Sequence, residues 1–253
     1  MHDASLEGFL SSVALRPEKV ARPDAYPFTI PAVRHLERIR FHPRVTFFVG
    51  ENGSGKSTLV EAIAVAAGFN REGGSNNFSF ATRDSVSDLH GALRLARSGR
   101  RPQTQFFLRA ESFHNLATNI EELDREPASA PPIIDSYGGR SLHEMSHGES
   151  FLTLLNKRFG DNGLYILDEP EAALSPRRQL AALARIHALA EAGSQFIIAT
   201  HSPLILSYPK ATIFALADGP MREVRYEETD AYRVTSDFLE KRHEYLRQLI
   251  ENT

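Results

Sequence analysis

The chain has 253 residues, of which 24% are charged and 42% are hydrophobic, and its formal net charge is −3. This composition is ordinary for a globular protein, and the small net charge excludes a strong global attraction to nucleic acids or membranes. The absence of cysteine excludes a disulfide framework and a thiolate metal site. No apolar run is long enough to span a bilayer, and the N-terminus lacks the basic and apolar segments of a signal peptide. We therefore expect a cytoplasmic protein with no membrane segment of its own.

The N-terminal part is expected to lead gradually into the fold. Residues 1–26 are mixed in character and predict an arm or a short helix. Two short strands are expected over 28–30 and 36–41, and the alternating pattern of the second predicts that it is half exposed. Tyr26 or Phe28 could stack on an adenine, or both could be aromatic residues at the edge of the core.

The most informative stretch is Val45–Thr58, which reads Val-Thr-Phe-Phe-Val-Gly-Glu-Asn-Gly-Ser-Gly-Lys-Ser-Thr. Its first five residues predict a buried strand, and apolar residues at helical spacing after Thr58 predict a helix. The loop between them matches Gly-x-x-x-x-Gly-Lys-Ser, in which glycines let backbone N–H groups surround a phosphate chain. Lys56 supplies a charge for the β- and γ-phosphates, and the Ser57 hydroxyl suits Mg²⁺. The nucleotide-binding residues are expected to be Gly50, Glu51, Asn52, Gly53, Ser54, Gly55, Lys56, Ser57 and Thr58.

Residues 71–160 are expected to form a lid made of loops and helices. It opens with a polar, glycine-rich loop, and the segment Asp84–Leu95 that follows predicts either an amphipathic helix or a strand. Five arginines gather in and after this segment, and they could contact a nucleic-acid backbone or form a solvated face. They are Arg94, Arg97, Arg100, Arg101 and Arg109.

A strand predicted over Gln105–Ala110 ends at Glu111. Ligands of open α/β sheets lie beyond the carboxyl ends of the strands, so a polar residue there can reach a metal ion or an attacking water. Glu111 is therefore a candidate metal-site residue. The chain from Asn119 to Leu142 is acidic and then rich in proline and glycine, which predicts a loop.

Ser146 and Glu149 have the Ser-x-x-Glu spacing of a capping box, which predicts the start of a helix. The N–H groups at that helix terminus favour an anion. The overlapping residues from His143 to His147 match the His-Glu-x-x-His pattern of zinc proteases. Zinc would need both histidines on one helix face and a third ligand, whereas the predicted helix begins between them, so the zinc interpretation is disfavoured.

Two further strands are expected to bring ionisable groups to one edge of the sheet. The strand Gly163–Leu167 is followed by Asp168 and Glu169, and the strand Gln195–Thr200 is followed by His201. Asp168 can hold Mg²⁺ directly or through water, and Glu169 can polarise the attacking water. His201 could contact the γ-phosphate or that water.

The C-terminal part predicts two more strands, near residues 212–217 and 224–226, and then one final amphipathic helix within residues 235–253. Ser236 or Asp237 is expected to cap this helix. Its inward-facing residues are expected to be Phe238, Leu246, Leu249 and Ile250.

Taken together, these segments resemble the motifs of the ABC-type ATPases. Gly50–Ser57 resembles the Walker A motif, Ser146–Glu149 the signature motif and Leu164–Glu169 the Walker B motif. Ala173–Ser175 resembles the D-loop, and Thr200-His201 resembles the switch motif. The order of the motifs and their separations also fit this family.

Within that superfamily, the P-loop and the residues after it resemble the RecF, SMC and OLD branch and stand-alone bacterial proteins labelled AAA family ATPases. The resemblance covers roughly residues 28–217. It implies one α/β P-loop NTPase domain over residues 1–253, with a mostly parallel sheet, an antiparallel N-terminal β part and the lid of residues 71–160. It also implies ATP and Mg²⁺ as cofactors and a homodimer that forms on ATP binding. In that dimer, the residues that bind the ATP of the other subunit would be Ser146, Gly148 and Glu149.

The chain departs from the family pattern in several places. His147 stands where many members have glycine, and no leading leucine precedes the signature. The usual glutamine of the Q-loop is not evident, and Glu111 is the candidate for that position. Ser112 and Met145 lie too close in the sequence to enclose the long coiled coil of SMC proteins.

The resemblance implies ATP hydrolysis with Glu169, His201 and Lys56 as the catalytic residues, and it leaves three functions open. The first is an ATPase for DNA maintenance or phage defence that works with DNA or an effector protein. The second is the nucleotide-binding subunit of an ABC transporter, against which the unusual signature and the RecF-like P-loop argue. The third is an ATP-gated switch with little turnover, against which the presence of Glu169 argues. A P-loop kinase is disfavoured because it would leave the signature motif unexplained.

Overall fold

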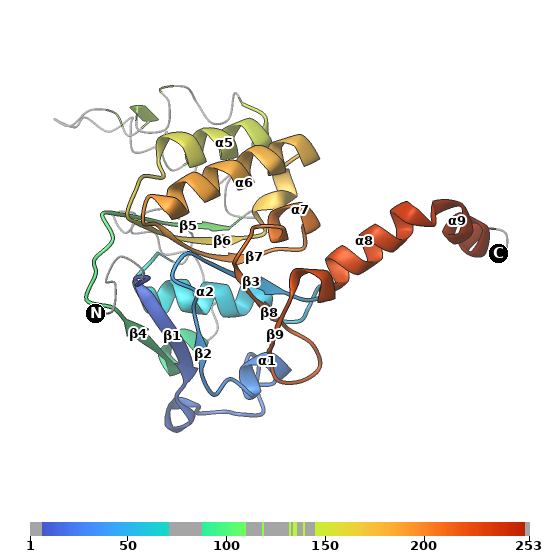
Figure 1. The fold of residues 1–253 in the computed structure, drawn as a ribbon. Coiled ribbons are helices and arrows are strands. Elements are labelled where there is room, and N and C mark those ends of the chain that lie inside the picture. Colours follow the sequence, from blue (N-terminus) through green and yellow to red (C-terminus); the bar gives the residue numbers. More distant parts are fainter. Residues whose placement is uncertain are drawn as a thin grey trace.

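A computed structural model describes residues 7–70, 88–109 and 145–250, together with positions 118, 132, 134, 135 and 139. Its centre is a six-stranded sheet with the strand order β5-β6-β7-β3-β8-β9 (Figure 1). The strands are β3 (Val45–Val49), β5 (Thr104–Arg109), β6 (Gly163–Asp168), β7 (Gln195–Ala199), β8 (Thr212–Ala215) and β9 (Arg222–Val224).

The sheet is parallel except at one edge. β5, β6, β7, β3 and β8 pair in parallel, and β9 pairs antiparallel with β8. Every residue of β3, β6 and β7 is buried, because layers cover both faces of the sheet. Continuous apolar runs are typical of such strands. The predicted α/β class with a mostly parallel sheet is confirmed.

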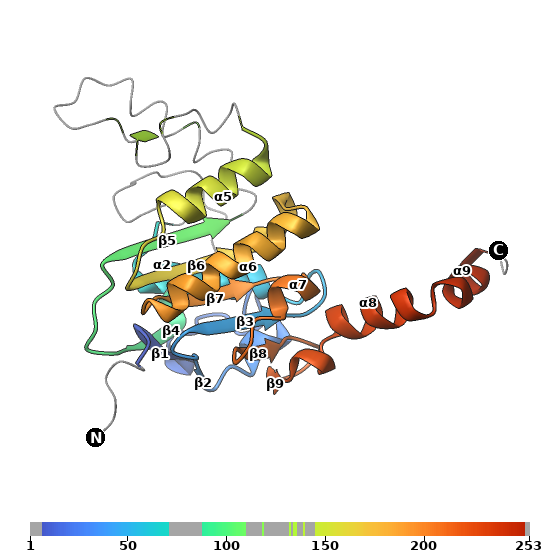
Figure 2. The ribbon, with the colours of Figure 1, turned by 45° about the horizontal axis from the view of Figure 1, so that its top comes forward.

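Helices cover both faces of this sheet (Figures 1 and 2). α5 (His147–Lys157), α6 (Pro176–Glu191) and α7 (Pro203–Leu206) lie on one face, and α2 (Lys56–Ala67) lies on the other. Side chains alternate between the faces along each strand. Phe47 therefore belongs to the core beneath α5 and α6, whereas its neighbour Phe48 belongs to the core around α2. None of the helices within the described ranges is long and apolar enough to cross a membrane.

A second, three-stranded antiparallel sheet has the order β2-β1-β4. It consists of β1 (Leu10–Leu15), β2 (Ile39–Arg40) and β4 (Leu93–Arg97). The short helix α3 (Leu89–Ala92) directly precedes β4, so the ambiguous segment before residue 95 contains both a helix and a strand. This sheet confirms the antiparallel N-terminal β part.

The positions of these N-terminal strands differ from the expectation. β1 lies within the segment expected to be an arm or short helix, and it is the central strand of its sheet. Its adjacent serines hide the strand pattern, although Ser12 is buried and accepts a hydrogen bond from Arg38 Nε at 3.2 Å. The expected strand over 28–30 is wrong, because these residues form turns that lead into the helix α1 (Pro31–Arg34). Proline suits the first turn of a helix, since its missing N–H is not needed there.

The C-terminal part also differs from the expectation. It contains two helices, α8 (Asp230–Glu240) and α9 (Arg242–Ile250), which extend away from the sheet (Figures 1 and 2). The cap is Thr229, whose side chain accepts a hydrogen bond from the Tyr232 N–H, and not Ser236 or Asp237. The predicted inward positions of Leu249 and Ile250 are wrong, since these side chains are 65% and 67% exposed. Two short 3₁₀ turns lie at Pro17–Lys19 and Tyr226–Glu228.

One buried amide joins the two sheets. Gln195, at the start of β7, is fully buried, and its side chain bonds the N–H and the carbonyl of Leu10 in β1 at 2.9 and 2.8 Å. It also donates to the carbonyl of His42 at 3.0 Å. Buried backbone groups need such partners, because an unpaired one loses its hydration without compensation.

We predict that Gln195→Leu lowers the free energy of unfolding by at least about 2 kcal/mol, because it leaves several buried backbone groups without partners. Chemical denaturation would measure this. The matched control is Gln103→Leu at an exposed position, which should change the stability little. Equal effects of the two substitutions would contradict this role of Gln195.

Candidate nucleotide-binding site

The pairing of three strands brings the predicted site residues to one edge of the sheet. Phe48 of β3 and Asp168 of β6 are both partners of Ala199 in the intervening strand β7. The P-loop follows β3 and His201 follows β7, so the chain leaves all three strands at the same edge. This is the edge where parallel α/β sheets bind ligands.

The P-loop is compact and depends on its glycines. Gly50 and Gly55 have φ angles of 153° and 93°, which side chains other than glycine rarely adopt. A Cβ atom at Gly50 would lie 2.4 Å from the carbonyl oxygen of Leu216, so glycine is also required sterically. Lys56 is 3% exposed, and its Nζ donates to the carbonyls of Gly50 and Glu51 at 2.9 and 3.0 Å.

The charge of Lys56 is balanced locally. Burial lowers the pKa of its ammonium group, and the negative charges of Glu169, Asp168 and Glu171 oppose this effect. The Lys56 ammonium group is therefore stabilised by the backbone carbonyls of the P-loop and by the carboxylates at the end of β6 and in the turn after it.

A pair of oxygen donors links the start of α2 to the end of β6. The Ser57 hydroxyl donates to Asp168 Oδ1 at 2.9 Å, and Asp168 is 6% exposed. Hydroxyl and carboxylate oxygens suit Mg²⁺, which is usually held by one or two carboxylates together with water and substrate phosphates. The part of the chain that the structure describes has no group of three or more acidic, histidine or cysteine residues able to hold a metal ion. Glu111, the other candidate, lies outside the described residues.

Glu169 and His201 meet at the same edge. His201 Nε2 is 3.1 Å from Glu169 Oε1, and the two side chains are 36% and 37% exposed. Glu169 has a φ angle of 49° and lies in the left-handed region. Such strain in a residue other than glycine typically persists at functional sites.

Sequence reasoning gave no role to Glu171, which the structure places beside this pair. Glu171 lies in the 3₁₀ turn Pro170–Ala173 that follows Glu169, and its Oε1 accepts hydrogen bonds from the N–H groups of His201 and Ser202 at 2.5 and 3.2 Å. In the sequence, Glu171 appears only as a second carboxylate two residues after Glu169. Such a pair is common in exposed turns and does not by itself indicate a contact with the chain after β7.

The predicted signature segment begins α5 as expected. Glu149 Oε2 accepts hydrogen bonds from the Ser146 N–H at 3.0 Å and from its hydroxyl at 2.7 Å, which lowers the pKa of Glu149. Arg178, near the start of α6, donates to Ser146 Oγ at 3.0 Å and forms an ion pair with Glu149 at 3.2 Å. This arginine was missed by sequence reasoning. His143, the first histidine of the zinc motif, lies outside the described residues.

The two aromatic residues before the P-loop occupy different environments. Phe28 is 7% exposed and belongs to the core, whereas Tyr26 is 65% exposed. The Tyr26 hydroxyl lies 2.7 Å from Thr58 Oγ1 in α2. Of these two, only Tyr26 is therefore free to contact a ligand beside the P-loop helix.

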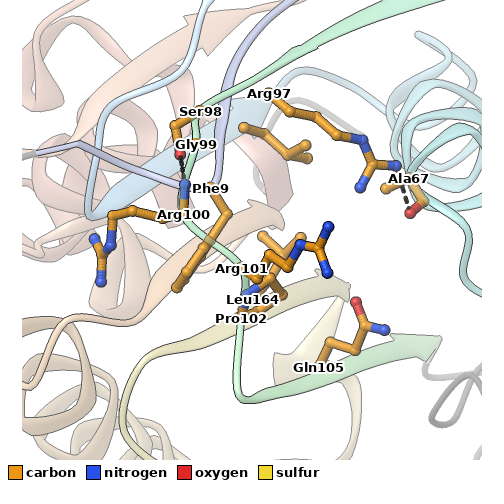
Figure 3. Close-up of a pocket in the computed structure, with 11 residues that line it drawn as sticks. Phe9, Ala67, Arg97, Ser98, Gly99, Arg100, Arg101, Pro102, Gln105 and Leu164 are labelled. Atoms are coloured by element: carbon orange, nitrogen blue, oxygen red, sulfur yellow. Dashed lines mark hydrogen bonds between the residues drawn. The ribbon is translucent and has the colours of Figure 1, made fainter.

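The arginine cluster lies elsewhere. A cavity of about 540 Å³ is lined by Arg97, Arg100 and Arg101 and by residues near the amino ends of β5 and β6 (Figure 3). The P-loop lies at the opposite edge, where the carboxyl ends of the parallel strands are found. Arg97 donates to the Ala67 carbonyl at 2.8 Å, and Arg100 donates to Asn162 Oδ1 at 3.0 Å. Arg109 forms an ion pair with Glu61 at 3.3 Å. Three of the five arginines thus make contacts within the fold, which favours a structural role for them.

Two family models match the sequence. Residues 28–124 match a family described as an AAA domain, and residues 133–207 match one described as "AAA domain, putative AbiEii toxin, Type IV TA system". No curated protein was found with significant sequence similarity to the chain.

Several solved structures are similar to this one. An ATP-binding cassette of an ABC transporter in its ADP conformation has 19% sequence identity and a TM-score of 0.53, over 90% of this chain and 95% of that chain. "An inward-facing conformation of a putative metal-chelate type ABC transporter" has 13% identity and a TM-score of 0.50, over 89% and 88%. The SMC head domain from Thermotoga maritima has 16% identity and a TM-score of 0.43, over 85% and 98%. At such low sequence identities, the two ABC transporter structures show a similarity of fold alone.

The contact between the signature segment and the turn after β6 gives a testable prediction. A Cβ atom at Gly148 would lie 2.7 Å from the Ala173 carbonyl oxygen and 2.7 Å from Arg178 Nη1. We predict that Gly148→Ala lowers the free energy of unfolding by about 1–3 kcal/mol, because the backbone must move to relieve the overlap. Chemical denaturation would measure it. Gly91→Ala is the matched control, since a Cβ atom there meets no atom within 4 Å; a similar loss in both variants would refute the prediction.

Proposed function

We propose that this chain, a P-loop ATPase of the ABC, RecF and SMC type, binds ATP and hydrolyses it in the presence of Mg²⁺. The observation that carries the proposal is the hydrogen bond between Ser57 and Asp168, with Glu169 and His201 paired beside it. A P-loop alone is compatible with many reactions of nucleotides. The added carboxylates and the histidine favour hydrolysis, because they can position a water next to the terminal phosphate.

Each residue has a proposed role in the reaction. Lys56 and the backbone N–H groups of residues 50–58 bind the phosphates, and Ser57 and Asp168 would hold Mg²⁺. When bound, this ion neutralises charge on the β- and γ-phosphates. Glu169 accepts a hydrogen bond from the attacking water and acts as its general base. His201 contacts the terminal phosphate and keeps Glu169 oriented through their 3.1 Å contact.

We further propose that two copies enclose the nucleotides. Ser146 is exposed at the start of α5, where helix N–H groups favour an anion. In an ATP-bound homodimer, Ser146, Gly148 and Glu149 would contact the ATP held by the P-loop of the partner. In this proposal residues 1–253 form one domain, and the protein works in the cytoplasm. Of the segment 71–160 that was expected to form a lid, β4 and β5 belong to the two sheets instead.

For the biological role, we propose DNA maintenance or phage defence with a DNA or effector-protein partner. The description of the second matching family, with its "Type IV TA system", supports a defence role more than a transport role. Stimulation of hydrolysis by duplex DNA would support DNA as the partner. Co-purification with a membrane protein would instead support the transporter alternative, and nucleotide binding with negligible turnover would support the ATP-gated switch.

We predict that Glu169→Gln lowers kcat for ATP hydrolysis by about 10²–10⁴-fold while ATP binding persists, because the amide cannot accept the proton of the attacking water. Phosphate release and nucleotide titration would measure the two effects. The control is Glu240→Gln, an exposed position on α8, which should hydrolyse ATP like the wild type. Unchanged kcat in Glu169→Gln would exclude Glu169 as the base.

We predict that the Glu169→Gln variant changes from monomer to dimer when Mg-ATP is added, because blocked hydrolysis traps the enclosed nucleotides. Light scattering would give the mass of the protein with and without nucleotide. Adding Ser146→Arg should abolish the dimer without affecting ATP binding, because the larger side chain occupies the place of the partner's phosphate. If ATP binds and the mass never changes, the signature residues do not act across a dimer.

A further inference from the structure

Two loops of the site are tied together by side chains. The first loop follows β6 and contains Glu169 and Glu171, and the second follows β7 and contains His201 and Ser202. The strands are adjacent, and the Glu169 N–H donates to the Ala199 carbonyl at 2.9 Å. The two loops therefore leave the sheet side by side.

The Glu171 carboxylate holds the backbone of the second loop. One oxygen, Oε1, accepts hydrogen bonds from two successive N–H groups, those of His201 and Ser202. An oxygen of this kind has two lone pairs, so it can accept both hydrogen bonds at once. The peptide unit before His201 and the one after it are thereby both fixed relative to the turn that carries Glu171.

A second pair of side chains holds the same loop from the other side. The Ser202 hydroxyl donates to Gln179 Oε1 at 2.5 Å, and Gln179 Nε2 donates to the Leu174 carbonyl at 3.0 Å. Ser202 Oγ also accepts from the N–H groups of Leu204 and Ile205 and so caps α7. Ser202 is thus anchored, and its N–H also donates to Thr200 Oγ1 at 3.0 Å, whereas Glu171 Oε1 is the acceptor for the N–H of His201.

We propose that Glu171 is a positioning residue that sets His201 against Glu169 during hydrolysis. This inference rests on the proposed ATPase function. Glu169 immediately precedes the 3₁₀ turn that contains Glu171, so one short turn presents the general base and also holds the backbone of its histidine partner. Small misplacements of reacting groups reduce rates strongly.

The second oxygen of Glu171 points to a role beyond simple capping. Oε2 is buried and has no hydrogen-bond partner within the described part of the chain. An unpaired buried oxygen is unfavourable for stability, so its retention in a native fold calls for an explanation. Oε1 accepts both hydrogen bonds from the second loop, so these two contacts, and not a partner for Oε2, fix the orientation of the carboxylate.

A double-mutant cycle tests this proposal. We expect Glu171→Ala to lower kcat for ATP hydrolysis by about 10–100-fold, with KM for ATP unchanged, because the geometry and not the binding is lost. In a His201→Ala background, the same substitution should cause no further loss. Glu171→Gln should stay close to the wild type, because its amide oxygen accepts the same two hydrogen bonds. Glu171→Asp keeps the charge but shortens the side chain, so it should behave like the alanine variant.

The outcomes that overturn the proposal are specific. An equal loss of kcat in the wild-type and His201→Ala backgrounds would mean that Glu171 does not act through His201. A raised KM with unchanged kcat would place Glu171 in binding instead. If Glu171→Ala does not fold, the glutamine and aspartate variants decide the question, since equal kcat in these two would also overturn it.

A measurement without hydrolysis separates this inference from the proposed function. Amide hydrogen exchange at His201, followed by NMR without nucleotide, should speed up by about tenfold or more in Glu171→Ala and Glu171→Asp. It should remain slow in Glu171→Gln and in the control Glu240→Ala. Unchanged exchange in Glu171→Ala would disprove the contact. A wild-type protein that shows no hydrolysis dependent on Glu169 would instead disprove the proposed function, whatever the exchange rates show.

Discussion

The site depends on the pairing of β6, β7 and β3. Their parallel register aligns Asp168, Ala199 and Phe48, so Asp168, the segment that contains His201 and the P-loop lie at the same edge of the sheet. A shift of one residue in either pairing would turn every side chain of a strand to the opposite face. Two separate cores, one on each face, oppose such a shift. Packing of the strands therefore fixes the relative positions of groups that lie far apart in the sequence.

The central part of the fold could be predicted from sequence because its signals are local. The apolar run before the P-loop, the glycines and the Ser-x-x-Glu cap of α5 each act within a few residues. β1 could not be predicted in this way, since Ser12 becomes buried only when β4 and β2 pair with the strand. The start of α8 differs from the predicted helix start, because Thr229 caps the helix well before Ser236 and Asp237.

The candidate site was predictable to a similar extent. Lys56, Ser57 and Asp168 come together as expected, because motif and strand order together determine their positions. Glu171 and Arg178 could not be assigned roles from the sequence. Their partners are the backbone of one loop and the first turn of another helix, and neither contact follows from a residue pattern. Contacts of this kind depend on how loops meet, which periodicity and spacing do not describe.

The buried amide of Gln195 has a mechanical consequence. It fastens the first residue of β7 to the antiparallel sheet, and the chain reaches His201 at the other end of the same strand. β7 has five residues, which span about 17 Å of extended chain, and it is buried along its whole length. Close-packed interiors deform little, so a strand of this kind is expected to move as a rigid unit. A displacement of the antiparallel sheet would therefore be passed along β7 toward the segment that contains His201.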